Sequence, residues 1–226
     1  MITMEKIYEK NVIRQYLNRK GYRNWFSHDF DDAAYLVRCR HNEILIRQGD
    51  EADTLYYLVK GKCRATAVNS EGKLCVINTI TAPNLIGEIE FISEDDSFSV
   101  EAVEDSLLIA LPYEACRDML LNDPKFLFHL CELLTEKERE HAIKLTQAAS
   151  FPLENRLAQF LLENAINKEI SLRKTVIAES LGVSYRHLEK VMKDFVEQGI
   201  LKKEKFVYTI TDEKELLDKA SALDIF

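Results

Sequence analysis

The sequence lacks the features that mark membrane proteins, secreted proteins and several classes of enzyme. Its longest uninterrupted apolar runs, such as 107–111, are far too short to cross a bilayer. The first residues contain no apolar signal-peptide core, so a cytoplasmic protein with no membrane partner is expected. There is no glycine-rich phosphate loop, no nucleophile elbow and no His-Glu-x-x-His motif. An enzyme is therefore not expected.

Glycine and proline are scarce, and the cysteines are scattered. Only seven glycines and four prolines occur in 226 residues that are 46% hydrophobic, which predicts one or two ordered domains. The five cysteines are odd in number and mostly set in apolar segments, which predicts buried, reduced thiols, with a redox-active thiol as the alternative. Cys39 and His41 alone are weak evidence for a metal site. No metal site and no cofactor is evident.

Basic residues are missing from 74–116, although the chain contains 30 Lys and Arg. The interval 87–112 contains eight acidic residues. A solvated acidic loop is the preferred interpretation, and a cation site is the alternative. The whole chain has a net charge of −8, which argues against nonspecific coating of nucleic acid but allows a local basic face.

Residues 175–201 predict two short helices joined by a tight turn. Gly182 is expected to end the first helix, because glycine tolerates the left-handed backbone just past a helix C-terminus. Ser184 is expected to cap the second helix by accepting a backbone N–H. This spacing predicts a helix-turn-helix whose second helix can enter a DNA major groove, with a plain αα-hairpin as the alternative. The apolar residues at helical spacing are Ile177, Ala178, Leu181, Leu188, Val191 and Phe195.

A basic segment follows the second helix. Residues 202–205 predict a turn before a β-branched and aromatic strand at 206–210, which would complete a winged helix-turn-helix. Between residues 171 and 208 there are eight Lys and Arg against five Asp and Glu, a net charge of +3. Such a face gains affinity for DNA by releasing counterions, although the wing lysines alone could form a merely solvated turn. The residues expected to contact DNA are Ser184, Tyr185, Arg186, Glu189, Lys190, Lys193, Lys202, Lys203 and Lys205.

The N-terminal half has a different sequence pattern, which predicts mainly short strands. A helix is expected over 5–20, and short strands punctuated by turns, with no helices between them, are expected from 33 to 112. This pattern predicts an antiparallel barrel or roll. A short helix at 113–121 follows. The fold class is therefore α+β, with an N-terminal antiparallel β-roll, a long dimerisation helix and a C-terminal winged helix-turn-helix.

A long helical pattern runs from 125 to 149. One set of residues recurs at spacings of 4, 3, 4, 3 and 4, which predicts a coiled-coil seam and hence a homodimer; a helix lying on its own domain is the alternative. The seam residues are Leu127, Cys131, Leu134, Glu138, His141 and Leu145. The expected domains are 1–122 for the N-terminal helix and the β-roll sensor, 123–149 for the dimerisation helix and 150–226 for the DNA-binding domain.

Four stretches together resemble the Crp/Fnr family of bacterial transcription regulators. They are 55–62 (LYYLVKGK), 85–88 (LIGE), 152–158 (PLENRLA) and the helix-turn-helix itself. The resemblance covers about 33–210. It implies a homodimer that presents two recognition helices to successive major grooves of a two-fold symmetric site, about 34 Å apart. RNA polymerase and an unidentified small-molecule effector are left open as further partners.

The resemblance also implies how the recognition helix would read DNA. Family members usually read bases with a glutamate and, one helical turn later, an arginine. Those positions hold Arg186 and Lys190 here, with Glu189 beside them. Arginine can contact guanine through two hydrogen bonds, whereas glutamate accepts from cytosine N4, so a half-site different from the best-known ones is expected.

The candidate effector pocket comes from the same resemblance. In members that bind cyclic AMP, a Gly-Glu pair contacts the ribose, and a later Arg-Ser or Arg-Thr holds the phosphate. Gly87 and Glu88 match the first element, and Ser97 matches the second, but Asp96 replaces the arginine. An anionic phosphate without a basic partner is unfavourable, so cyclic AMP in the usual mode is not expected.

Other cofactors of the family are not supported by the residues. The iron–sulfur branch uses a cysteine cluster near the N-terminus, which this chain lacks, and no residue stands out as a haem ligand. The leading hypothesis is a sequence-specific DNA-binding regulator with an unidentified effector. The alternative is a roll that binds an effector or a protein, joined to a degenerate DNA-binding domain.

Overall fold

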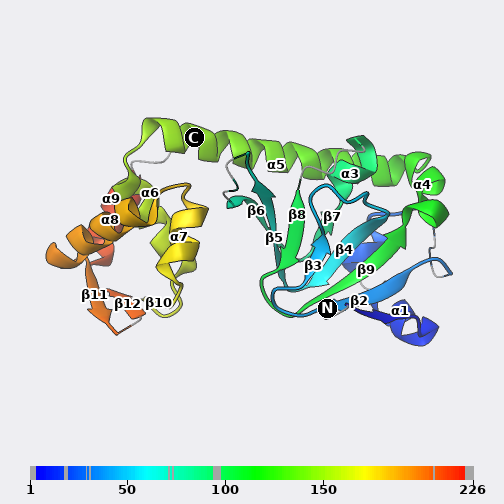
Figure 1. Ribbon diagram of the computed structural model, residues 1–226, viewed down its shortest axis with the longest axis horizontal. Coiled ribbons are helices and arrows are strands. Elements are labelled where there is room, and N and C mark those ends of the chain that lie inside the picture. The colour runs from blue at the N-terminus through cyan, green and yellow to red at the C-terminus, as the bar shows by residue number, and fades with distance from the viewer. Residues whose placement is uncertain are drawn as a thin grey trace. The chain divides into compact units, whose positions relative to one another are not determined.

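Helix α5 (Pro124–Ser150) spans the boundary between two units of the chain, Met1–Thr135 and Glu136–Phe226 (Figure 1). The computed structural model describes residues 4–17, 20–28, 30, 32–70, 72, 74–93, 98–205 and 207–221. Because the boundary between the units falls inside α5, it does not test the three expected domains, and that division stays a prediction.

Two antiparallel sheets form most of the first unit. One sheet has the order β1 (Glu5–Ile7), β2 (Tyr35–Cys39), β9 (Ser106–Pro112), β4 (Thr54–Lys60), β7 (Asn84–Ile86). The other has the order β3 (Ile44–Ile46), β8 (Ser99–Ala102), β5 (Lys62–Val68), β6 (Leu74–Thr81). The helices of this unit are α1 (Lys10–Leu17), α2 (Lys20–Arg23), α3 (Glu88–Ser93) and α4 (Tyr113–Leu121). The expected antiparallel roll is confirmed.

The five-stranded sheet is buried on both faces. Along β4, Tyr56 and Leu58 point into the core between the two sheets, while Leu55 and Tyr57 point into a second core against the helices. This division follows from the pleat, since successive side chains of a strand point to opposite faces. Both faces require apolar residues, which explains why the strands appear in the sequence as continuous apolar runs.

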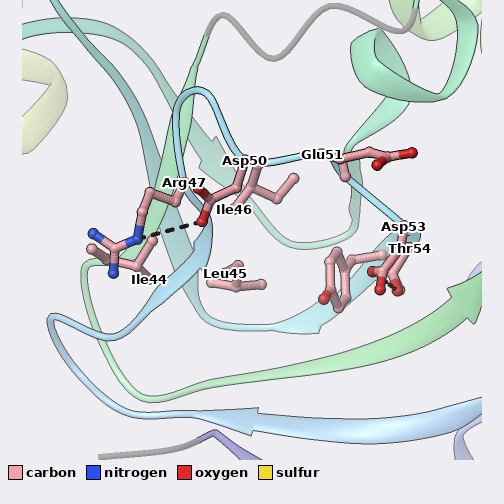
Figure 2. Close-up of a pocket in the computed structure, with 10 residues that line it drawn as sticks. Ile44, Leu45, Ile46, Arg47, Asp50, Glu51, Asp53 and Thr54 are labelled. Carbon is pink, nitrogen blue, oxygen red and sulfur yellow. Dashed lines mark hydrogen bonds and ion pairs between the residues drawn. The ribbon is translucent and has the colours of Figure 1, made fainter. Parts of the chain in front are cut away.

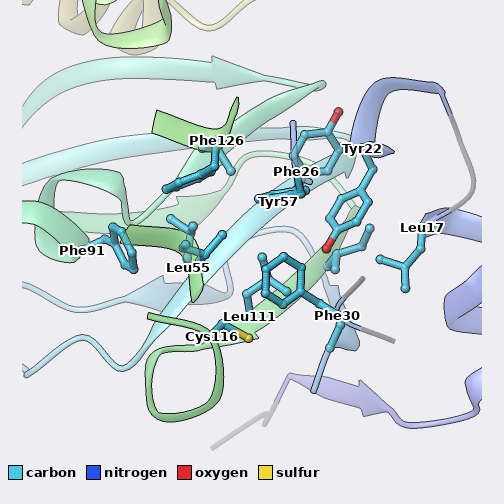
Figure 3. Close-up of a cluster of buried hydrophobic side chains, with 14 of the residues drawn as sticks. Leu17, Tyr22, Phe26, Phe30, Leu55, Tyr57, Phe91, Leu111, Cys116 and Phe126 are labelled. Atoms are coloured by element: carbon cyan, nitrogen blue, oxygen red, sulfur yellow. The ribbon is translucent and has the colours of Figure 1, made fainter. Parts of the chain in front are cut away.

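Aromatic rings fill the second core and fix the first turn of α5 (Figure 3). Phe126 of α5 is fully buried, and its ring stacks on that of Phe26, with the ring centroids 5.6 Å apart. Phe91 of α3 meets Phe126 edge-on at 5.9 Å, and Tyr22 meets Tyr57 of β4 edge-on at 5.4 Å. Such pairs add to the free energy gained from burying the rings. The long helix is therefore joined to the roll by its N-terminal residues.

Two expectations for the first unit are wrong. The helix expected over 5–20 begins only at Lys10, because Glu5–Ile7 form β1, in which Lys6 pairs with Val37 of β2. The expected absence of helices between 33 and 112 is contradicted by α3.

The second unit is a winged helix-turn-helix, as expected. Its helices after α5 are α6 (Leu153–Asn164), α7 (Lys174–Ser180), α8 (Tyr185–Glu197) and α9 (Glu213–Ser221). Its sheet has the order β10 (Glu169–Ile170), β12 (Val207–Ile210), β11 (Leu201–Glu204). One core joins all of these elements, with Leu157 and Leu161 of α6, Leu188 of α8 and Leu216 of α9 fully buried. Leu217, the residue after Leu216 in α9, is exposed.

Asp123 caps α5 and ties it to an earlier segment. The side chain is fully buried, accepts the Lys125 N–H at 3.0 Å and accepts the Ser27 N–H at 2.6 Å. Burial opposes ionisation of this carboxyl group, but the N–H groups outweigh burial and hold the pKa of Asp123 below its ordinary value. The ionised carboxylate is therefore the form that stabilises the folded chain.

We expect Asp123→Ala to lower the free energy of unfolding by about 2 kcal/mol, because it removes a helix cap and leaves the Ser27 N–H without its acceptor. The stability that Asp123 contributes is complete above the ordinary carboxyl pKa and is lost as the pH falls below about 4. Urea unfolding at pH 7 and at lower pH measures both effects.

The matched control is Asp118→Ala on α4, because Asp118 is exposed and its substitution should change stability by no more than about 0.5 kcal/mol. Equal losses for the two variants would contradict the role assigned to Asp123.

Candidate nucleic-acid interface

The turn between α7 and α8 has the expected geometry. Gly182 has a φ of +64°, and the N–H of Val183 donates to the carbonyl of Ala178 at 3.0 Å, which closes the C-terminus of α7. The hydroxyl of Ser184 accepts the N–H of His187 at 3.2 Å and caps α8. Both predictions, for the glycine and for the cap, are confirmed.

Arg156 of α6 fixes the same turn from behind. Its Nη1 donates to the carbonyl of Leu181, the last residue before Gly182, at 2.9 Å. The guanidinium is partly buried, and burial lowers the pKa of Arg156. A charged group therefore supports a helix C-terminus, where a cation is favoured by the helix dipole.

Helix α8 has one buried and one exposed face. Leu188, Met192 and Phe195 are buried, whereas Val191, expected in the core, is only partly buried. Both Val191 and Met192 lie on the side of α8 that carries Leu188, because residues three and four apart share a helix face. The face that remains exposed carries most of the expected DNA contacts, namely Tyr185, Arg186, Glu189, Lys190 and Lys193.

A groove of about 460 Å³ lies between α8 and the wing. Five cations line it together with a single carboxylate, that of Glu189. The hydrophobic part of the lining is Met192, Val196 and the ring of Tyr208. The groove is therefore strongly positive in a chain whose net charge is −8. Its cations are Lys174, Arg186, Lys190, Lys193 and Lys203.

Glutamates already pair with two of these cations. Lys174 Nζ lies 2.8 Å from Glu189 Oε1, and Lys193 Nζ lies 3.2 Å from Glu197 Oε1. The hydrogen bond to Lys174 lowers the pKa of Glu189, and the same bond raises the pKa of Lys174. Lys174 was not among the residues expected to contact DNA. Only the packing of α7 against α8 brings it to Glu189, fifteen residues further along the chain.

The three wing lysines do not share one face. The segment expected as a turn is strand β11 up to Glu204, so Lys202 and Lys203 point to opposite faces of the ribbon. Lys203 lines the groove with its Nζ 5.9 Å from the ring centroid of Tyr208. Lys202 pairs with Glu204 at 2.6 Å, outside the groove. Lys205 ends the strand with a left-handed φ of +52°.

Comparisons with known proteins agree with this geometry. Residues 36–123 match the family model "Cyclic nucleotide-binding domain", and residues 155–219 match "Crp-like helix-turn-helix domain". The regulatory protein YeiL of Escherichia coli O157:H7 is 35% identical over 209 residues, which cover 92% of this chain and 95% of YeiL. The cAMP-activated global transcriptional regulator CRP of Salmonella typhimurium is 24% identical over 70% of this chain and 80% of that protein.

The chain belongs to the Crp/Fnr family. Among solved structures, a Crp/Fnr regulator from Eubacterium rectale matches 92% of this chain and 97% of its own with a TM-score of 0.75 and 18% identity, which supports the fold. This family consists of DNA-binding transcription regulators and not of enzymes, so the expectation that the protein is not an enzyme is confirmed.

Of the three residues expected to form the effector pocket of this Crp/Fnr chain, the structure describes Gly87 and Glu88. Ser97 lies outside the described residues. Gly87 has a φ of +90° and its carbonyl accepts the Tyr113 hydroxyl at 3.0 Å, while Glu88 is buried at the start of α3. Burial is the largest cause that raises the pKa of Tyr113; the charges of Glu90 and Glu88 raise it further, and Arg117 opposes them. The surroundings of Gly87 are therefore rich in negative charge.

A pocket of about 220 Å³ lies in the roll (Figure 2), and neither Gly87 nor Glu88 is among the residues that line it. Thr54 lines it, and the Thr54 carbonyl oxygen lies 3.1 Å from where a Cβ on residue 87 would stand. The one basic side chain in the lining, Arg47, lies 3.7 Å from the carboxylate of Asp50. Glu51 and Asp53 also line the pocket, so its acidic groups outnumber its basic ones.

The seam residues of α5 are mostly exposed in the single chain. Leu127 is half-buried against the roll, whereas the other five are exposed, and the side chain of Leu145 is 73% exposed. The exposed members are Cys131, Leu134, Glu138, His141 and Leu145. No described residue of the chain buries these five positions of α5.

The cysteines follow the expectation in part. None of the five, all of them described residues, forms a disulfide; Cys39, Cys63 and Cys116 are buried, whereas Cys75 is half-buried and Cys131 is exposed. Burial raises the pKa of Cys63 and of Cys116 to about 11, so both thiols stay protonated at neutral pH.

Within the described residues, no group of three or more His, Cys, Asp or Glu side chains is placed to hold a metal ion. None of the helices in the same part of the chain has an apolar stretch that could span a membrane.

We expect Lys203→Ala to weaken binding to every DNA sequence by a similar factor, because a lysine of the groove wall meets phosphates and not bases. The slope of log K against log salt should become less steep by about 0.9 for each half-site. Fluorescence anisotropy on cognate and scrambled duplexes at several salt concentrations measures both quantities.

Lys202→Ala is the matched control, since it removes the same charge from the adjacent residue of the same strand but outside the groove. Its effect on affinity and on the salt slope should be much smaller. Equal effects of the two substitutions would show that the groove does not define the DNA-binding face.

Proposed function

We propose that this Crp/Fnr protein is a sequence-specific transcription regulator that binds a two-fold symmetric DNA site as a homodimer. The observation that carries the proposal is the groove beside α8, in which five cations surround the exposed face of a capped recognition helix. Arg186 begins this face and Lys190 and Lys193 continue it, at the spacing of successive helical turns. The intact groove favours this function over a roll joined to a degenerate DNA-binding domain.

The homodimer is supported by the exposed stripe on α5. Leu134 and Leu145 are apolar residues on one helix that the chain leaves exposed, and they recur at coiled-coil spacing. Two copies packed along this stripe would bury both leucines. Glu138 and His141 lie between them and would fix the register of the pair at some cost in stability.

The effector, if one acts on the roll, is not cyclic AMP in the usual mode. No Lys or Arg occurs over 74–116, and the pocket in the roll has more carboxylates than cations. A phosphate held there would face three carboxylates, and the one basic side chain of the lining, Arg47, already lies beside Asp50. The name cAMP-activated belongs to the Salmonella relative and is not carried over to this chain. A cytoplasmic location and contact with RNA polymerase also stay predictions.

The test is a selection of genomic DNA fragments by the purified protein at about 0.1 M salt, at which phosphate contacts still contribute to the affinity. We expect enrichment of a two-fold symmetric site, and adding cyclic AMP should change neither the site nor the affinity. Sequence-blind binding by the protein alone would contradict the proposal, and a response to cyclic AMP would contradict its statement on the effector.

On the selected site, Arg186→Ala should lower the affinity by about 1–3 kcal/mol per half-site and relax the preference at one base pair, because arginine reads guanine through two hydrogen bonds. Binding to a panel of duplexes, each with one base pair changed, locates that position. Equal losses on cognate and scrambled DNA would show that Arg186 contacts only the backbone.

For the dimer, Leu145→Gln should raise the dissociation constant about a hundredfold, because two leucines worth about 1.5 kcal/mol or more each leave the interface. Ile166→Gln is the control, since Ile166 is 76% exposed but lies outside α5. Sedimentation at micromolar concentration measures both variants. A wild-type protein that is a strict monomer would contradict the homodimer.

A further inference from the structure

Lys174 differs from the other cations of the groove. It is the first residue of α7, and its side chain is only 19% exposed, whereas Arg186, Lys190, Lys193 and Lys203 are all exposed. A cation in the first turn of a helix is disfavoured by the helix dipole. Its position therefore requires a partner, and that partner comes from α8.

Three side chains from two other elements surround the Lys174 amine. Nζ donates to Glu189 Oε1 at 2.8 Å and lies 5.8 Å from the ring centroid of Tyr185, both on α8. After the hydrogen bond to Glu189, which is the largest cause, the Tyr208 side chain of β12 also raises the pKa of Lys174. The amine is therefore held in one place between α7, α8 and the wing.

These contacts in turn hold the Glu189 carboxylate. The Tyr185 hydroxyl donates to the same Oε1 at 3.4 Å, so Lys174 and Tyr185 both engage one oxygen and leave Oε2 available to a base edge. The nearby charge of Lys203 adds to the lowering of the pKa of Glu189. Glu189 lies one turn after Arg186 on the face that lines the groove.

Stability does not explain this arrangement. Ion pairs at exposed groups contribute little to the free energy of folding, and Glu189 is exposed. Fixing a side chain before binding has a different effect, because it removes the entropy that would otherwise be lost when the side chain is ordered in the complex. A glutamate that is already ordered can read a base with less loss of affinity.

We propose that Lys174 is a positioning residue for base recognition: it orients Glu189 so that Oε2 accepts the N4 amino group of a cytosine in each half-site. The inference rests on the proposed function. Under this inference Lys174 does not contact a phosphate, because its ammonium group is paired with the Glu189 carboxylate. The half-site then contains a C·G pair whose reading depends on a residue outside the recognition helix.

The first experiment follows the Glu189 carboxyl group by ¹³C NMR during a pH titration without DNA. In Lys174→Met the pKa of Glu189 should rise, because the hydrogen bond that lowers it is lost, and in Lys174→Arg it should stay low. An unchanged pKa in Lys174→Met would overturn the proposed contact. Circular dichroism of each variant verifies that it is folded.

The second experiment measures affinity for the selected site and for duplexes with one base pair changed. Glu189→Gln identifies the base pair that Glu189 reads. Lys174→Met should lower the preference for cytosine at that same pair by roughly tenfold, with the salt slope unchanged. The double variant should lose no more than Glu189→Gln alone, and Lys174→Arg should keep the preference.

Lys193→Met is the matched control, because Lys193 lies in the same groove and also pairs with a glutamate, Glu197, but that glutamate does not line the groove. It should weaken all sequences alike. The same uniform loss for Lys174→Met, with a salt slope less steep by about 0.9 per half-site, would overturn the proposal and make Lys174 a phosphate contact.

Failure of the proposed function gives a different result from failure of this inference. If the wild-type protein selects no site, the function and the inference both fall. If it selects a site but Glu189→Gln or Lys174→Met leaves every base preference unchanged, only the inference falls.

Discussion

The short turn between α7 and α8 is the constraint on which the DNA-binding surface depends. Gly182 supplies a left-handed residue, Ser184 starts the next helix, and Arg156 holds the Leu181 carbonyl from α6. A Cβ at Gly182 would meet no atom within 4 Å, so backbone conformation and not space requires the glycine. The turn sets the angle between the two helices, and that angle decides which α8 residues are buried and which face the groove.

The two units differ in the charge that surrounds their candidate binding sites. The roll side has no Lys or Arg from 74 to 116 and buries Glu88 and Glu90 near Tyr113, whereas the groove gathers five cations around one carboxylate. A phosphate is therefore favoured on one unit and disfavoured on the other. This contrast underlies the proposal that the chain binds DNA and that its roll does not bind cyclic AMP in the usual mode.

Features set by local spacing could be predicted from the sequence, and features set by packing could not. The helix-turn-helix followed from a glycine, a serine cap and apolar residues at helical intervals. Strand β1 was missed because its pairing depends on β2, some thirty residues away, and α3 was missed because it buries two glutamates. In the site, the placement of Lys202 and Lys203 on opposite faces could be predicted only by recognising residues 201–204 as a strand, not as a turn. The contact of Lys174 with Glu189 could not be predicted, because it depends on how α7 packs against α8.

The paired lysines of the DNA-binding domain have a consequence for how the protein discriminates among sequences. Lys174, Lys193 and Lys202 each carry a glutamate of the same chain as a tethered counter-ion. A phosphate that approaches such a lysine must compete with a carboxylate that cannot diffuse away, so less entropy is gained than from the release of a mobile ion. Random DNA, which offers phosphates alone, is therefore expected to gain less from this surface than its lysine count suggests.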